Sequence, residues 1–91
     1  MWKVRVPKKM QKTVRGLPPL VQEALRLLLR DLKSNGPVAG SWPNYSKLSG
    51  NRHHCHIKKG RPTYVSVWWE VRSEKQTIEV VYVGTHENAP Y

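Results

Sequence analysis

The 91-residue sequence predicts a single α+β domain, in which two helices pack on one face of an antiparallel sheet. Three observations indicate this fold class: a period-two pattern near the start, a helical apolar spacing further along, and three strand-like segments with short turns in the second half. Consecutive strands joined by short turns form an antiparallel meander, and an amphipathic helix must bury its apolar stripe against it. The predicted order is β-α-α-β-β-β, in one domain spanning residues 1–91.

The first half of the chain supplies one strand and two helices. Residues 2–6 alternate apolar and cationic side chains, which is typical of a strand with one buried face. Residues 8–16 are polar and favour a short helix that ends at Gly16. The helix at 20–33 is the clearest element, because its apolar residues recur three and four positions apart. Its predicted buried face consists of Leu17, Leu20, Val21, Ala24, Leu25, Leu28 and Leu32.

The second half begins with a loop and continues as three strands. Residues 38–51 are rich in Gly, Pro, Asn and Ser, which predicts a loop. Strands are predicted at 53–59, 63–72 and 76–85, with short turns between them. The last two are rich in Val, Ile, Trp, Tyr and Thr, as strands usually are.

Positive charge dominates the chain and is not evenly mixed with negative charge. There are 16 Lys and Arg against 6 Asp and Glu, which makes the formal net charge +10. Neither residues 1–22 nor residues 32–69 contain an acidic side chain. Long acid-free stretches predict a positive surface that meets phosphates or an acidic protein, although a basic protein without a particular partner has the same composition.

Several classes of protein are excluded or disfavoured by the composition. No apolar run approaches the roughly 18 residues of a membrane span, and the first residues contain no apolar signal core, so we expect neither membrane insertion nor secretion. The single cysteine, Cys55, cannot form an internal disulfide and fits a reducing cytosol, which predicts a cytoplasmic protein. No Gly-rich phosphate fingerprint is present, which disfavours Rossmann enzymes and P-loop ATPases.

The strand at 53–59 predicts a cluster of functional side chains. Because side chains alternate along a strand, apolar Cys55 and Ile57 are expected to face the core. His54, His56 and Lys58 then share the opposite face, about 6.5–7 Å apart along the strand. Imidazoles and a cation would therefore line up on one exposed sheet surface.

Further candidates come from the neighbouring turn and from the end of the chain. Lys59 and Arg61 lie in the turn that follows this strand. His86 stands at the end of the last predicted strand, and Tyr91 follows five residues later. We expect these side chains to converge with the histidines of the strand at 53–59.

These residue types fit RNA cleavage without a metal ion. The 2′-hydroxyl can act as the nucleophile if a base takes its proton, an acid protonates the leaving 5′-oxygen and cations stabilise the charge on phosphorus. Histidine serves as acid or base near neutral pH, and Lys or Arg supplies fixed positive charge. Aromatic rings stack on unpaired bases. No Asp or Glu is evidently placed to bind Mg²⁺, so no cofactor is expected.

Plainer interpretations of the histidines remain open. His54 and His56 are compatible with ordinary exposed strand positions. A zinc site is disfavoured, because alternation separates Cys55 from His54 and His56, whereas tetrahedral zinc needs three or four converging ligands. Cys55 is expected to act as a small buried hydrophobe.

The order of these segments resembles the RelE/ParE toxin family of bacterial toxin–antitoxin systems, over nearly the whole chain. The resemblance is carried by the sequences WPNYSKL at 42–48, HIKK at 56–59, WEV at 69–71 and YVGTHENAPY at 82–91. It implies a small cytosolic toxin that a cognate antitoxin wraps and holds inactive. In the RelE branch, it further implies cleavage of mRNA in the ribosomal A site.

The resemblance also assigns roles to individual residues. Lys58 matches a strand lysine used in catalysis, and His56 stands where some members have a second lysine. His86 stands where members carry Arg or His, and Tyr91 resembles an aromatic residue that stacks on the target base. The Arg that some RelE members carry on the middle meander strand has no match near Ser66, and Arg61 is the candidate substitute.

The hypothesis is therefore a ribosome-dependent, metal-independent endoribonuclease. His56 and His86 are predicted to transfer protons, Lys58 and Arg61 to stabilise the phosphate, and Tyr91 to stack on the base. Which histidine is the acid and which the base stays open. Further RNA contacts are expected from His54, Lys59 and Arg52. The alternatives are a ParE-like toxin that binds gyrase and a non-catalytic basic RNA-binding module.

Overall fold

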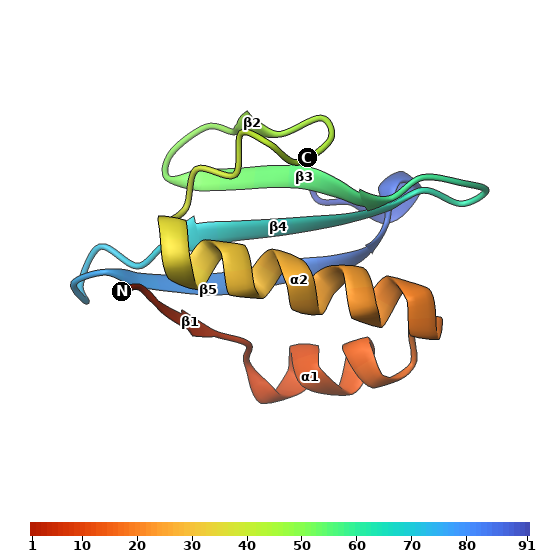
Figure 1. Cartoon of the computed structure of the whole chain (residues 1–91), viewed down its shortest axis with the longest axis horizontal. Coiled ribbons are helices and arrows are strands. Elements are labelled where there is room, and N and C mark those ends of the chain that lie inside the picture. The colour runs from red at the N-terminus through yellow and green to blue at the C-terminus, as the bar shows by residue number, and fades with distance from the viewer.

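The computed structural model describes all residues, 1–91, and contains two helices against a five-stranded sheet (Figure 1). Every predicted helix and strand is present, so the α+β prediction is confirmed. The structure adds a two-residue strand inside the predicted loop and a 3₁₀ turn after the last strand. The elements are β1 (Lys3–Arg5), α1 (Lys8–Arg15), α2 (Pro19–Asn35), β2 (Ser46–Lys47), β3 (Arg52–Lys58), β4 (Tyr64–Glu70), β5 (Thr77–Thr85) and a 3₁₀ turn, η1 (His86–Asn88).

The sheet is mixed, with strand order β1-β5-β4-β3-β2. The meander β3-β4-β5 is antiparallel as predicted, and β2 adds to it in the antiparallel direction. The prediction of a wholly antiparallel sheet is wrong for β1, which runs parallel to β5 and pairs Lys3 with Thr77. No hairpin turn joins these two strands, so nothing imposes an antiparallel direction on them.

Helix α2 lies across one face of the sheet and supplies much of the core (Figure 1). Its buried stripe is Val21, Leu25, Leu28 and Leu32, which shows the predicted three-four spacing. Leu20 was expected in this stripe but is 69% exposed. It lies one residue, or about 100° of helix rotation, away from Val21 and therefore points off the stripe.

The face of the sheet away from the helices, here called the outer face, has a buried layer of its own. Val65 and Val67 of β4 are fully buried but do not belong to the helix-side core cluster. Their cross-strand partners are His56 and His54 on β3. Opposed residues share a face and lie close together, so the two histidines sit directly beside these valines.

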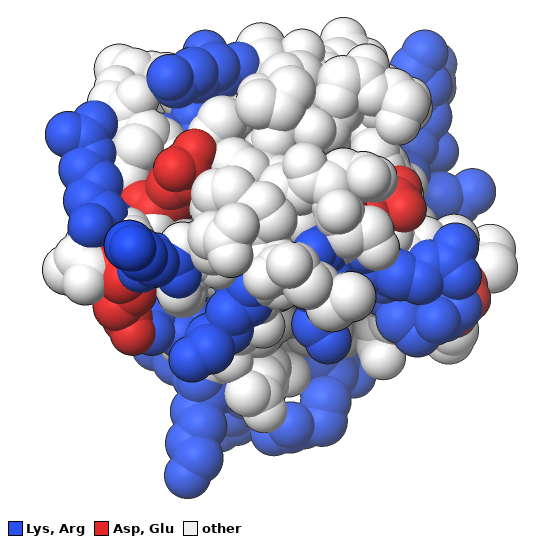
Figure 2. Space-filling model, turned by 60° about the vertical axis from the view of Figure 1, so that its left-hand side comes forward, with Lys and Arg blue, Asp and Glu red and all other residues white.

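Cations cover much of the surface. On the side of the molecule shown in Figure 2, Lys and Arg side chains surround an uncharged area, and acidic side chains are few. Neither helix is long and apolar enough to span a membrane.

Candidate active site

Strand β3 presents His54 and His56 on the outer face, as the alternation predicted. His53, Cys55 and Ile57 are buried on the helix side, whereas His54 and His56 are only partly buried. The rings of His54 and His56 lie 6.2 Å apart, centroid to centroid. Two imidazoles therefore lie side by side on the outer face of a strand whose other face is packed in the core.

Strand β2 fastens the His54 side chain. Ser46 pairs with His54 across the two strands, and the Ser46 hydroxyl lies 3.0 Å from the His54 Nδ1 atom. Next to it, Tyr45 Oη lies 2.7 Å from Nδ1 of buried His53. The two-residue strand that sequence analysis missed thus orients one member of the cluster.

The end of β5 brings a third imidazole to the same place. The His86 backbone N–H donates to the carbonyl oxygen of Thr63 at 2.8 Å, which holds the start of η1 beside the start of β4. The ring centroids of His86 and His56 are 5.3 Å apart, in an edge-on arrangement. The two rings are thus in direct contact, and both line the same pocket.

The tail after η1 returns along β3, where the C-terminus lies in Figure 1. Tyr91 there packs 4.5 Å from the His54 ring and 6.1 Å from the His86 ring, centroid to centroid. Tyr91 is 45% exposed, so it is only partly covered by these contacts. The four predicted residues His54, His56, His86 and Tyr91 thus form one cluster, although they come from two distant parts of the chain.

Gly84, near the end of β5, leaves room for the Tyr82 side chain beside this cluster. The Tyr82 side chain lies over Gly84, and its hydroxyl donates to the carbonyl oxygen of Thr85 at 2.8 Å. A Cβ atom on Gly84 would lie only 2.6 Å from the Tyr82 Oη atom. A larger residue at position 84 would therefore displace Tyr82 and loosen the strand end that carries His86.

An open pocket of about 680 Å³ lies between the β3–β4 turn and η1. Only three of the nine residues that line it, His56, Arg61 and His86, were predicted as site residues, and the missed ones include Thr63, Glu87 and Asn88. Glu87 and Asn88 follow His86 directly, which was a usable signal, whereas nothing in the sequence marks Thr63 as part of a site. The lining consists of His56, Gly60, Arg61, Pro62, Thr63, Thr85, His86, Glu87 and Asn88.

The environment of His56 favours the neutral imidazole. Burial lowers the pKa of His56, and the nearby His86, His54 and Lys59 lower it further. The His56 Nδ1 atom is buried and has no hydrogen-bond partner. In the imidazolium form this nitrogen would be a buried donor without an acceptor, which is costly. His56 is therefore held unprotonated near neutral pH.

Two other members of the cluster also have shifted pKa values. Burial lowers the pKa of His54. Burial raises the pKa of the Tyr91 phenol, so this side chain stays uncharged at neutral pH.

The structure brings only some of the predicted cations to the pocket. Arg61 lines the pocket, and Lys59 is close enough to lower the pKa of His56. The prediction that Lys58 shares a face with His54 and His56 is wrong. A register shift in β3 between His56 and Lys58 interrupts the alternation, and Lys58 pairs with Tyr64, whose side chain packs on the helix side.

Arg52 also lies away from the pocket. It is paired with Trp69 at the far end of β3, and its guanidinium is 3.4 Å from the Ser49 hydroxyl. Burial raises the pKa of the Cys55 thiol to about 12, so Cys55 stays a protonated core residue. No group of three or more His, Cys, Asp or Glu side chains is arranged to hold a metal ion.

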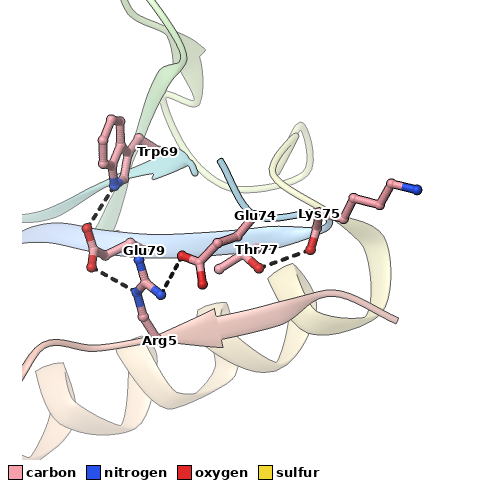
Figure 3. Close-up of polar contacts among 6 residues, drawn as sticks. All are labelled: Arg5, Trp69, Glu74, Lys75, Thr77 and Glu79. Carbon is pink, nitrogen blue, oxygen red and sulfur yellow. Dashed lines mark hydrogen bonds and ion pairs between the residues drawn. The ribbon is translucent and has the colours of Figure 1, made fainter. Parts of the chain in front are cut away.

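The opposite end of the outer face carries a paired charge network, here called the Arg5 clamp, which consists of Arg5, Trp69, Glu74 and Glu79 (Figure 3). The Arg5 guanidinium contacts Glu79 at 2.9 Å and Glu74 at 2.7 Å. The Trp69 indole N–H donates to the second Glu79 oxygen at 3.0 Å. The hydrogen bonds from Trp69 and Arg5 together lower the pKa of Glu79.

No protein-family model matches the sequence, and no curated protein matches it. Solved structures do match. The chain superposes on a mutant of Escherichia coli toxin RelE in the free state with a TM-score of 0.73 at 19% identity, covering 94% of this chain and 84% of that one.

Two further structures are similar over almost their whole length. The YoeB dimer from Staphylococcus aureus has a TM-score of 0.67 at 13% identity, with 93% of this chain and 97% of that chain covered. The archaeal RelE–RelB complex from Pyrococcus horikoshii has a TM-score of 0.65 at 12% identity, with 97% and 98% covered. The resemblance indicated by the sequence is thus confirmed at the level of architecture: this chain has the fold of the RelE toxins.

Proposed function

We propose that this chain is the toxin of a toxin–antitoxin pair and acts as an endoribonuclease that cleaves mRNA in the ribosomal A site, inhibiting translation in the cytosol. The observation that carries the proposal is the pair of imidazoles, His56 and His86, 5.3 Å apart at the wall of a pocket that also contains Arg61. The RelE-like fold supports the same conclusion.

The proposed reaction is an attack of the ribose 2′-hydroxyl on the adjacent phosphorus. A base takes the 2′ proton, the new O–P bond forms, the bond to the 5′-oxygen breaks, and an acid protonates that oxygen. The products are a 2′,3′-cyclic phosphate and a free 5′-hydroxyl. His56 suits the base, because its lowered pKa keeps it unprotonated near neutral pH. His86 then serves as the acid.

Two further groups complete the proposed site. Arg61 stabilises the negative charge that builds on the phosphate oxygens in the transition state. Tyr91 stacks on the base next to the cleaved linkage, because its uncharged ring is partly exposed beside His54. His54 keeps that ring in place through their contact.

The proposal is tested by primer extension on a message that is being translated, with and without the purified protein. The expected result is a set of new 5′ ends within codons, which disappears when translation initiation is blocked. Cleavage without ribosomes would remove the A-site part of the proposal. Absence of any cleavage in the presence of ribosomes would rule out the proposed nuclease activity.

The competing functions give different results in cells. After induction, the proposed nuclease stops translation and shortens messages while plasmid supercoiling stays normal. A gyrase-binding toxin would change supercoiling and leave messages intact. A non-catalytic RNA-binding module would bind RNA with a strong salt dependence and produce no cleaved ends.

The proposed partner is an acidic antitoxin that covers the basic face of the toxin. The similar Pyrococcus horikoshii structure is a RelE–RelB complex. Charge complementarity favours an acidic, partly disordered segment that folds as it binds. A purified complex is expected to leave a translated message uncut. Cleavage by the intact complex would contradict direct covering of the site.

A further inference from the structure

A second hollow, of about 450 Å³, lies on the helix side of the β3–β4 turn. The first residues of α2 form one wall of this hollow and the turn forms the other. No acidic side chain lines it. The residues are Pro18, Pro19, Leu20, Val21, Lys58, Lys59, Arg61, Pro62 and Tyr64.

The register shift in β3 accounts for the position of Lys58 in this hollow. Opposed residues in a sheet share a face, so the pairing of Lys58 with Tyr64 puts its side chain on the same side as the Tyr64 ring. That ring packs on the helix-side core. Lys58 is therefore separated by the sheet from the imidazoles of His56 and His86.

The two hollows have a common wall. Arg61 and Pro62 line both of them, so only the β3–β4 turn separates the second hollow from the imidazole pocket. None of Lys58, Lys59 and Arg61 forms an ion pair, since the ion pairs of the protein involve only Arg5 and Arg26 among its cations. Three unpaired cations thus continue the pocket around the turn.

We propose that this second hollow binds the sugar–phosphate backbone of the RNA that flanks the cleaved linkage. The inference rests on the proposed function and extends its site. A strand held against His56 and His86 has to leave the pocket, and the exit over Arg61 leads to two further cations, Lys58 and Lys59, with no competing carboxylate. Lys58 and Lys59 then contact flanking phosphates, and Lys58 does not touch the reacting one.

Binding of uncleavable 2′-O-methyl RNA tests this assignment without requiring cleavage. The double variant Lys58→Ala/Lys59→Ala is compared with the wild type on an oligonucleotide of about ten residues and on a dinucleotide. For the long RNA, the slope of log K against log salt is expected to fall by about 0.7 for each lost phosphate contact. Binding of the dinucleotide is expected to fall much less, because only Lys59 of the two is near His56.

A matched control removes the same charge elsewhere. Lys8 and Lys9 are adjacent, exposed lysines on α1, and Lys8→Ala/Lys9→Ala should leave the slope for the long RNA near the wild-type value. An equal reduction of the salt slope in the two double variants would mean that only net charge matters, which overturns the proposal. A loss of dinucleotide binding as large as the loss for the long RNA in the Lys58→Ala/Lys59→Ala variant would also overturn it, and so would wild-type binding that does not depend on RNA length.

Kinetics on translated messages separate this inference from the proposed function. Lys58→Ala should raise KM and leave kcat unchanged, because a flanking contact is made equally in the ground state and the transition state. A fall in kcat would make Lys58 a catalytic residue and overturn the inference. If the wild type does not cleave at all, the nuclease proposal fails, while the salt slopes still decide whether the second hollow binds RNA.

Discussion

The two ends of the outer face differ in how their polar groups are satisfied. At one end, the Arg5 clamp gives each Glu79 oxygen a donor, from Arg5 and from Trp69 (Figure 3). At the other end, three imidazoles lie together with no acid bonded to them, and His56 keeps a buried nitrogen without a partner. Paired polar groups hold strands together, whereas partly exposed imidazoles without a carboxylate partner can contact a ligand. The comparison therefore associates the first end with stability and the second end with the proposed chemistry.

The largest expected effect comes from removing one imidazole. His86→Ala should lower cleavage of translated mRNA by about 10²–10⁴-fold, the usual contribution of general acid–base catalysis. The melting temperature should not change, because His86 is exposed. Primer extension and thermal unfolding measure the two effects. Undiminished cleavage in this variant would place the chemistry elsewhere.

Replacing the stacking ring should have a smaller effect. Tyr91→Ala should weaken binding of the target RNA by about 1–3 kcal/mol, the typical value for stacking of one base. Tyr91→Phe keeps the ring and serves as the control, with nearly full activity expected. Equal losses in both variants would indicate a role for the hydroxyl instead of the ring. KM for a translated message, measured for both variants, distinguishes these cases.

Substitutions in the Arg5 clamp should have the opposite pattern to His86→Ala: they should lower stability and leave cleavage unchanged. Glu79→Ala should cost about 1–3 kcal/mol of unfolding free energy, because it leaves the half-buried Trp69 indole N–H without its acceptor. Glu74→Ala should cost less, since both partners of that ion pair are substantially exposed. Urea unfolding followed by tryptophan fluorescence measures both losses. Cleavage well below the melting temperature should stay at the wild-type level, and a loss there would break the division between the two ends.

The two ends should also lose stability in different pH ranges. The pKa of His56 is lowered from 6.5, so its stabilising contribution is full above about pH 6.5 and is lost as the pH falls through the lowered value. The pKa of Glu79 is lowered from 4.5, so its contribution is lost only below pH 4.5. Urea unfolding between pH 8 and pH 3 should show both declines. His56→Asn should reduce the upper one and Glu79→Gln the lower one, and a variant that altered the other range would contradict the assignment.

The sequence predicted the elements of the fold well, because periodicity reports which face of each element is buried. The stripe of α2 and the alternation of β3 both follow from a single buried surface. The direction of β1 was not predictable in this way, since its partner β5 lies far away in the chain. The short β2 was also missed, because two residues are too few to show a periodic pattern.

The clustering of the candidate residues was predicted as far as strand alternation holds. His54, His56, His86 and Tyr91 do form a cluster, since two strand ends meet there. Lys58 was misplaced because one register shift moves a side chain to the other face of a sheet, and no local signal in the sequence marks that shift. Thr63 and Arg61 join the pocket through the path of a turn, which composition alone does not determine.

The position of β5 in the sheet has a consequence for folding. This strand is the last in the sequence, yet it lies inside the sheet, between β4 and β1. Until it inserts, β1 has no neighbour, and the strand end that carries His86 is not beside Thr63. A chain in which β5 has not yet inserted therefore has no assembled pocket, and insertion of this one strand completes both the sheet and the proposed site.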